Sequence, residues 1–239
     1  MAYAYPAGCR QGTTCEILIG GQYLKEASEV YLAGEGVKSE VIKWYRPLTR
    51  AQYNDLRKQL QEAKERLIKA GTGQPSDAEV ARSAGVSEYE LGEMESFLAR
   101  ERDPRRQPND QLIEVKTIRL TVEKDAPLGK RELRLLTDDT ISNPLWLHIG
   151  NRPEFCETEP NNVPPRSWEP ENVISELPAV VNGQIMPGDI DCFSFEARKG
   201  MHIVIQVAAR DVIPYLADAV PGWFQAVLRL TDKYGKEIR

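Results

Sequence analysis

The sequence predicts a mainly β protein with two β-sandwich domains and a helical insertion in the first. Short runs of alternating apolar residues, separated by Gly, Pro, Asn and Asp, recur on both sides of a central stretch with a helical period. A segment rich in Pro, Asn and Glu then separates two groups of strands, as a linker does. These observations divide the chain into a first domain at 5–150 with an insertion at about 48–110, a linker at 151–178 and a second domain at 179–239.

The amino-acid composition limits which kinds of protein this chain can be. The chain has 239 residues, of which 41% are hydrophobic, so it can build one large core or two ordinary ones. Its formal net charge of −5 gives no reason to expect nucleic acid as a partner. No apolar run approaches the roughly 20 residues that a membrane-spanning helix needs, so we expect no membrane span.

The strands of the first domain are expected on both sides of the insertion. Before it, β-rich or alternating runs predict strands at 14–20, 29–33 and 37–44. After it, alternation at 118–122 and 132–136, separated by an Asp-Ala-Pro-Leu-Gly turn, predicts a hairpin, and 142–149 supplies a last strand.

The insertion is predicted to hold three helices, each started by a capping box. The boxes pair Thr49 with Gln52, Ser76 with Glu79, and Ser87 with Glu90. Gly71 is the expected stop of the first helix, and the third helix runs to about Arg100.

Residues 74–91 resemble a helix-turn-helix of the bacterial sigma-factor type. Its second helix, however, carries Glu88, Glu90, Glu93 and Glu95, and DNA phosphates repel carboxylates. DNA binding through 74–100 is therefore the less favoured reading. A helical insertion folded against a sheet accounts for the same residues.

The second domain is predicted from strands at 179–186, 192–197, 201–207 and 223–230, with a loop at 211–222 and a hairpin turn at 232–235. We expect a further strand to follow Arg239, because the last predicted strand would otherwise leave an unpaired edge.

Two acidic segments offer candidate metal ligands. Their six hard oxygen side chains are Glu157, Glu159, Asn161, Asn162, Asp189 and Asp191. Calcium takes roughly 6–8 oxygen ligands of this kind, so calcium is the cofactor that these residues suggest. The alternative is a polar linker followed by an ordinary turn, because Asp, Asn, Gly and Pro form turns.

Four cysteines, Cys9, Cys15, Cys156 and Cys192, allow three pairings. Convergence of the two acidic segments on one ion would carry Cys156 and Cys192 together, since each adjoins an acidic residue. Cys9 and Cys15 flank a Gly-Thr-Thr turn and could close a small loop. Four reduced thiols remain the alternative. The chain has no C-x-x-C pair and only two histidines, which argues against a zinc site.

The first domain resembles an immunoglobulin-like domain of the IPT/TIG type. The resemblance is carried by Gly-Thr-Thr at 12–14, Asp-Ala-Pro-Leu-Gly at 125–129 and Ser-Asn-Pro-Leu at 142–145. It implies a sandwich of short antiparallel strands, which the helical insertion interrupts.

The region 157–239 resembles the bacterial pre-peptidase C-terminal domain, with the family's downstream strands missing. The matching motifs are Glu-Thr-Glu-Pro-Asn-Asn at 157–162, Val-Asn-Gly at 181–183, Gly-Asp-Ile-Asp-Cys-Phe-Ser-Phe at 188–195 and Ala-Arg-Lys-Gly at 197–200. The resemblance implies a truncated, jelly-roll-like β-sandwich. In collagenase members it also implies a calcium site, and the six oxygen residues above stand at its positions. Asn162 replaces an Asp that many members carry, which lowers the charge of the site.

The sequence therefore predicts a non-catalytic accessory module for adhesion or substrate targeting. The order of the two domains resembles the N-terminal part of large secreted proteins of planctomycete-type bacteria, a likeness of architecture that implies no specific ligand. We expect the rest of the parent chain as a partner, and an extracellular protein or polysaccharide is a further candidate. Ala-Tyr-Ala at 2–4 is similar to the end of a secretory signal and favours an extracytoplasmic location. Part of a secreted peptidase is the alternative. We expect no catalytic residues, since His148 and His202 are best explained as strand residues.

Overall fold

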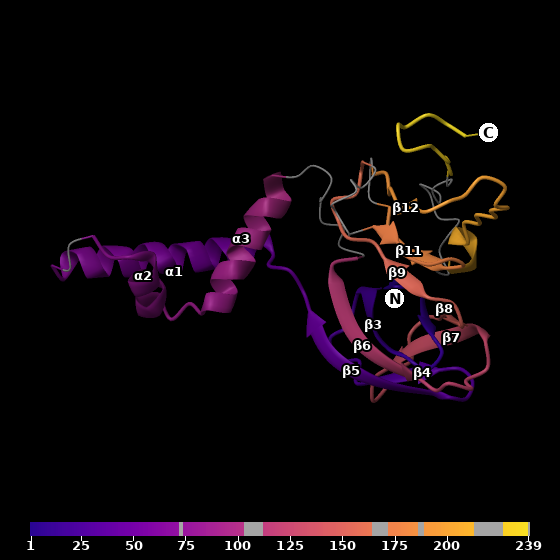
Figure 1. Cartoon of the computed structure of the whole chain (residues 1–239). Helices are drawn as coiled ribbons and strands as arrows, with labels where there is room; N and C mark the ends of the chain where they lie inside the picture. The colour runs from indigo at the N-terminus through magenta and orange to yellow at the C-terminus, as the bar shows by residue number, and fades with distance from the viewer. Residues whose placement is uncertain (72–73, 103–111, 164–171, 186–188, 213–226, 239) are drawn as a thin grey trace. The chain divides into compact units, whose positions relative to one another are not determined.

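The computed structural model describes residues 1–71, 74–102, 112–163, 172–185, 189–212 and 227–238 (Figure 1). In these residues the chain forms twelve β-strands and three α-helices, so the prediction of a mainly β fold is confirmed. The strands and helices belong to two compact units. One unit comprises Met1–Trp44 and Glu114–Arg239, and the other comprises Tyr45–Ile113.

The first four-stranded sheet has the order β1-β3-β6-β5. Its strands are β1 (Tyr3–Tyr5), β3 (Thr14–Gly21), β6 (Glu114–Val122) and β5 (Val37–Tyr45). The strands β1 and β6 both pair antiparallel with β3. The helical unit is therefore inserted between two neighbouring strands of this sheet, β5 and β6.

The second four-stranded sheet has the order β2-β8-β7-β4. Its strands are β2 (Gly8–Arg10), β8 (Leu145–Gly150), β7 (Gly129–Leu136) and β4 (Glu29–Leu32). The strand β2 runs parallel to β8, whereas the other two pairs are antiparallel. Since β1 belongs to the first sheet, the chain passes from one sheet to the other between Tyr5 and Gly8.

The two sheets share one hydrophobic core, to which every second residue of four strands contributes. Its fully or almost fully buried members on these strands are Ile17, Ile19, Ile118, Leu120, Leu133, Leu135, Leu145 and Leu147. Burying each such side chain contributes about 1.5–3 kcal/mol, so this cluster is the main stabilising element of the unit. The alternation read from the sequence is the pattern that fills it.

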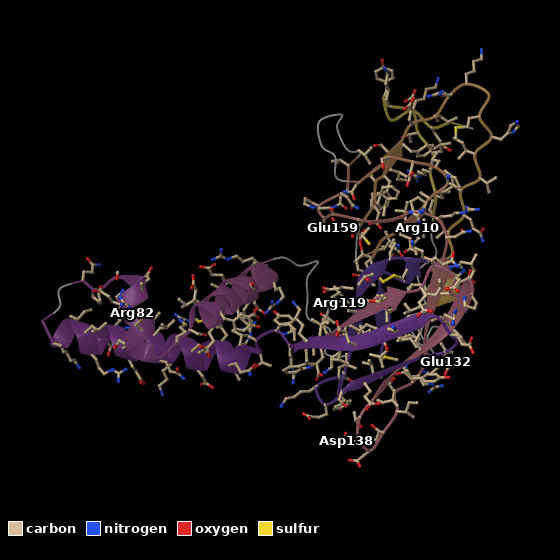
Figure 2. All side chains as sticks on the ribbon, turned by 60° about the horizontal axis from the view of Figure 1, so that its bottom comes forward. Arg10, Arg82, Arg119, Glu132, Asp138 and Glu159 are labelled. Carbon is tan, nitrogen blue, oxygen red and sulfur yellow. A yellow bond between two sulfur atoms is a disulfide. The ribbon has the colours of Figure 1, made fainter. Side chains whose placement is uncertain are left out.

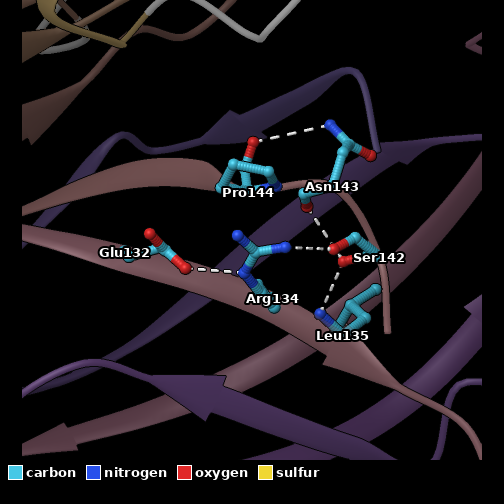
Figure 3. A network of polar contacts seen from close by, with 6 residues as sticks. All are labelled: Glu132, Arg134, Leu135, Ser142, Asn143 and Pro144. Carbon is cyan, nitrogen blue, oxygen red and sulfur yellow. Dashed lines mark hydrogen bonds and ion pairs between the residues drawn. The ribbon is translucent and has the colours of Figure 1, made fainter. Parts of the chain in front are cut away.

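A polar network fixes the connection between β7 and β8 (Figure 3). The guanidinium of Arg134 donates to Glu132 Oε1 at 2.6 Å and to the carbonyl oxygen of Ser142 at 2.8 Å. The hydroxyl of Ser142 in turn accepts from the backbone N–H of Leu135 at 2.9 Å. These contacts hold the turn against the strand that it leaves.

The expected strands of the first domain are present, with each end within four residues of its predicted position. The prediction missed β1 and β2, which have three residues each. The Ala-Tyr-Ala sequence at 2–4 overlaps β1, where Ala4 lies opposite Ile19. In this structure these residues are part of the first sheet.

The residues after Gly150 form only short strands. Strand β9 (Glu154–Cys156) pairs parallel with β11 (Val180–Asn182), and β10 (Val173–Ile174) pairs parallel with β12 (Ser194–Phe195). A 3₁₀ helix, η2, covers Ala209–Val212. All of these residues belong to the same unit as the two sheets.

The strand predicted at 201–207 is not formed. No described residue pairs with it, and the side chains of Val204 and Val207 are 92% and 51% exposed. An extended segment becomes a strand only when a partner satisfies its backbone groups.

The hairpin turn at 232–235 is present, with Asp232 N donating to Lys236 O at 2.8 Å. The Pro-Gly turn at 187–188, residues 213–222 of the predicted loop and the first half of the strand at 223–230 lie outside the described residues.

The helical unit contains the three predicted helices, α1 (Arg50–Lys69), α2 (Asp77–Ala84) and α3 (Glu88–Arg102). The capping boxes of α1 and α2 are complete, and at the start of α3 the side chains of Ser87 and Glu90 bond reciprocally to each other's backbone N–H. Gly85 turns the chain between α2 and α3 in the left-handed conformation, and Val86 beside it is buried. The two helices are joined by a short turn, as the sequence predicted. No helix of the described chain has the length and apolar character to cross a membrane.

Candidate metal site

The candidate site begins where β9 ends. Strand β9 pairs with β11 so that Cys156 lies opposite Asn182. One residue further on, the backbone N–H of Glu157 donates to the carbonyl oxygen of Asn182 at 3.0 Å. This pairing fixes the backbone that carries Glu157.

Asn182 attaches this strand pair to the beginning of the chain. Its side chain accepts from the N–H of Ala7 at 3.1 Å and donates to Glu154 Oε2 at 3.1 Å. The hydroxyl of Tyr5 donates to its carbonyl oxygen at 3.4 Å. Asn182 is 8% exposed, so these bonds satisfy a polar side chain that is removed from water.

Three carboxylates converge next to this anchor. Glu157, Glu159 and Asp191 each place one oxygen atom within 4.8 Å of those of the other two, and we call this group the acidic cluster. Glu159 is labelled in Figure 2. The segment of Asp191 is held against that of Glu159 by two hydrogen bonds: Cys192 N donates to Asn161 O at 3.0 Å, and Ile190 N donates to Asn162 Oδ1 at 3.1 Å. The two acidic segments singled out in the sequence therefore lie side by side in the fold.

Gly183 permits the close approach of the carboxylates. A Cβ atom at this position would lie 2.6 Å from Asp191 Oδ2 and 3.0 Å from Glu157 Oε2. A larger residue would therefore push the carboxylates away, because real Cβ atoms do not approach other atoms so closely. The next residue contributes a bond from its backbone, since Gln184 N donates to Glu157 Oε1 at 2.6 Å.

Several polar atoms of the site are buried without a hydrogen-bond partner among the described residues. They are Glu157 Oε2, Asp191 Oδ1 and both side-chain polar atoms of Asn161. Asn161 is only 2% exposed, and its backbone N–H donates to Glu159 Oε2 at 2.9 Å. Buried polar groups are almost always paired, so atoms like these call for an explanation such as a bound ion.

The electrostatics of the acidic cluster oppose the ionisation of its members. Burial is the largest cause that raises the pKa of Glu157 to about 7, and the charges of Asp191 and Glu159 raise it further, while the N–H of Gln184 lowers it. Burial also raises the pKa of Asp191, with Asp189 and Glu159 adding to the effect. The pKa values of both carboxyl groups are therefore raised, with burial as the largest cause for each.

The donor set fits a hard divalent cation. The three carboxylates supply anionic oxygens, and the buried side chain of Asn161 carries an amide oxygen without a hydrogen-bond partner among the described residues; calcium prefers oxygen ligands of these kinds. Of the six residues singled out from the sequence, Glu157, Glu159 and Asp191 lie together, and the backbone N–H of Asn161 contacts Glu159. The Oδ1 atoms of Asn162 and Asp189 both accept from Ile190 N, at 3.1 and 3.0 Å, and so shape the turn beside the cluster.

The cysteines are divided into one bonded pair and two thiols. Cys9 and Cys15 form a disulfide with a Cα–Cα distance of 6.2 Å. Cys156 and Cys192 are both free thiols in the structure. The sequence favoured a bond between them, and this bond is not formed.

The thiol of Cys156 lies near the hydroxyl of Tyr5. Burial is the main cause that raises the pKa of both groups, and the nearby Glu157 raises both as well. Both groups are therefore held in their neutral forms at physiological pH.

The sequence argument missed two residues of the site, Asn182 and Gly183. Both lie in the Val-Asn-Gly motif, which carried part of the resemblance at 157–239 but was not assigned a role. The histidines lie apart from the acidic cluster: His148 is an exposed residue of β8, and His202 is exposed in a segment without strand pairing. The chain as a whole matches no protein-family model, and no curated protein matches it in sequence.

Proposed function

We propose that this chain is a non-catalytic binding module of a larger extracytoplasmic protein, and that its acidic cluster binds calcium. The observation that carries this proposal is the group of three converging carboxylates beside buried polar atoms that lack a partner in the described chain. A calcium ion would be held by Glu157, Glu159, Asp191 and the amide oxygen of Asn161. Its charge would offset the repulsion among the carboxylates and tie the segment after β9 to the segment before β12.

The strand order supports an immunoglobulin-like sandwich as the scaffold. In constant-type immunoglobulin domains, four strands form one sheet and the others form a second sheet packed against it. Here the order β1-β3-β6-β5 corresponds to the first sheet of that arrangement, and β8-β7-β4 corresponds to the second, with β2 added at its edge. The resemblance of 157–239 to a pre-peptidase C-terminal domain supports the assignment of calcium, and we propose that this region is the beginning of such a domain.

The disulfide supports a location outside the cytoplasm. Disulfides persist in oxidising compartments and are rare in the cytosol. The Cys9–Cys15 bond links β2 to β3, one strand from each sheet, and therefore belongs to the core of the unit. A module of this kind would target its parent protein to an extracellular protein or polysaccharide.

Calcium titration tests the proposal. We expect calorimetry to show one saturable binding event for calcium, and the thermal midpoint to rise with calcium and fall after chelation with EDTA. The double variant Glu157→Gln/Asp191→Asn should lose both responses. Glu29→Gln is a matched control, since it removes one exposed carboxylate of β4 outside the cluster. A chain that shows neither response at millimolar calcium would refute the calcium site.

A further inference from the structure

A pocket of about 470 Å³ lies where β2 and β8 end side by side. Arg10 is the last residue of β2 and lies opposite Gly150, the last residue of β8. The N–H of Gln11 donates to the carbonyl oxygen of Gly150 at 2.8 Å and keeps the two strand ends together. The pocket is lined by Arg10, by residues 151–153 after β8 and by residues 176–178 before β11.

The backbone holds these segments in place. The N–H of Val180 donates to the carbonyl oxygen of Pro153 at 2.8 Å, which ties the two lining segments together. Both segments continue directly into the paired strands β9 and β11. The pocket is therefore built on hydrogen-bonded strand ends, which hold side chains more firmly than a free loop.

Two arginines, Arg10 and Arg152, line this pocket. Within the described ranges, the side chains of Arg10 and Arg152 make no ion pair or hydrogen bond. Other arginines of the same unit are engaged: Arg119 binds two carboxylates, and Arg134 binds Glu132. A guanidinium presents its donors as a planar fork that matches a carboxylate, so two such groups at one pocket favour an anionic ligand.

The rest of the lining selects among anions. Glu176 adds one carboxylate, which repels a bare inorganic anion but accepts hydrogen bonds from hydroxyl groups. Asn151 adds an amide that both donates and accepts. Pro153, Leu177 and Pro178 supply an apolar wall that can contact the C–H face of a ring. The volume lies in the range of about 300–1,000 Å³ that is usual for small-ligand sites.

We propose that this pocket binds a sugar acid, such as the uronate unit of an acidic saccharide. Arg10 and Arg152 bind its carboxylate, Glu176 and Asn151 bind its hydroxyl groups, and the Pro and Leu side chains contact its ring. This inference deepens the proposed targeting role by naming a ligand class. It uses residues outside the acidic cluster, so it stands or falls separately from calcium.

Ligand titration of the full chain tests the inference. Glucuronate, glucose and acetate are titrated separately, each in calcium and in EDTA, with calorimetry and ligand-observed NMR as readouts. We expect saturable binding of glucuronate in both buffers, with glucose and acetate each at least tenfold weaker. Arg10→Gln and Arg152→Gln should each weaken glucuronate binding about tenfold, as loss of one charge-assisted pair implies. Arg198→Gln is the control, because it removes a highly exposed guanidinium that does not line the pocket.

Three outcomes would overturn the inference: no glucuronate binding, equal binding of glucose or acetate, or unchanged binding in both pocket variants. Both arginines are exposed, so the variants are expected to fold, and their thermal midpoints check this. Glucuronate binding without a calcium response would refute the calcium site and leave this one standing. A calcium response without glucuronate binding would do the reverse.

Discussion

Gly34 leaves the space that the guanidinium of Arg131 occupies. A Cβ atom at Gly34 would overlap with Arg131 Nη1, and the backbone there has a positive φ of 89°. Arg131 is 6% exposed and donates to three carbonyl oxygens, those of Ala33 at 2.8 Å, Pro127 at 2.6 Å and Glu35 at 3.3 Å. This buried cation therefore joins the turn after β4 to the turn before β7.

Replacing Gly34 with Ala should destabilise the sheet unit strongly. The new methyl group would displace the guanidinium and leave buried carbonyl oxygens without a donor, at a cost on the order of 3 kcal/mol in the free energy of unfolding. Urea denaturation measures this change. Gly129→Ala is the matched control, because its φ is 124° but no atom lies within 4 Å of the added Cβ, so only backbone strain of about 1 kcal/mol is expected. Equal losses in the two variants would contradict the role of Arg131.

Asn182→Ala should also lower stability, by roughly 2 kcal/mol. The variant removes bonds to Ala7 N and Glu154 Oε2 and leaves both groups partly buried without a partner. Hydrogen exchange should show faster opening of β9 and β11, while the two large sheets keep their protection. Gln22→Ala, at an exposed loop position, should change neither. Unaltered exchange in β9 would show that Asn182 does not anchor this region.

The acidic cluster should make the stability of the calcium-free chain depend on pH. The folded-state pKa of Glu157 is about 7, above its ordinary value of 4.5, so the folded chain binds more protons than the unfolded chain between these values. The free energy of unfolding should therefore fall as the pH rises from about 4.5 to about 7. The raised pKa of Asp191 acts in the same direction.

Thermal melts in EDTA at several pH values between about 4.5 and 8 measure this dependence. Glu157→Gln should flatten the profile, since the amide cannot ionise, and calcium should do the same in the wild-type chain by stabilising the charged form. A thermal midpoint of the wild-type chain that rises with pH across this window would contradict the raised pKa of Glu157.

Alkylation without a reductant, followed by mass spectrometry, should modify Cys156 and Cys192 and leave Cys9 and Cys15 linked. The Cys9→Ser/Cys15→Ser variant should be about 2 kcal/mol less stable, because the bond closes a short loop in the unfolded chain. A linked Cys156–Cys192 peptide would instead restore the pairing that the sequence argument favoured.

Random duplex DNA at low salt should not be retarded by the chain in a gel-shift assay. The first turn of α3 carries Glu88 and Glu90, and a recognition helix must approach phosphates at this end. Because α2, a short turn and α3 follow one another as in a helix-turn-helix, this measurement tests whether the segment also binds DNA. A retarded band that disappears at higher salt would revive the DNA-binding reading of 74–100.

The sequence by itself determined the elements whose stabilising contacts are local. Thr49, Ser76 and Ser87 each bond to a residue three positions away, so the helix starts could be predicted within a residue. The alternation of Leu133 and Leu135 likewise predicted which face of β7 is buried, because the period of a strand is fixed by its backbone. The residues of the acidic cluster could be singled out in part from local sequence, since they lie in short segments rich in carboxylates.

Only the tertiary structure decided the features that depend on contacts between distant residues. The segment at 201–207 alternates like a strand and is not one, because a strand also needs a partner along its edge. Arg131 carries a charged side chain, which is normally found at the surface, yet it is buried. Gly34, which lies 97 positions earlier in the sequence, leaves room for its guanidinium. Glu157 and Asp191 approach each other only because Gly183 lies between their segments. Pairing, burial and close approach are properties of two or more segments at once, and no single stretch of sequence specifies them.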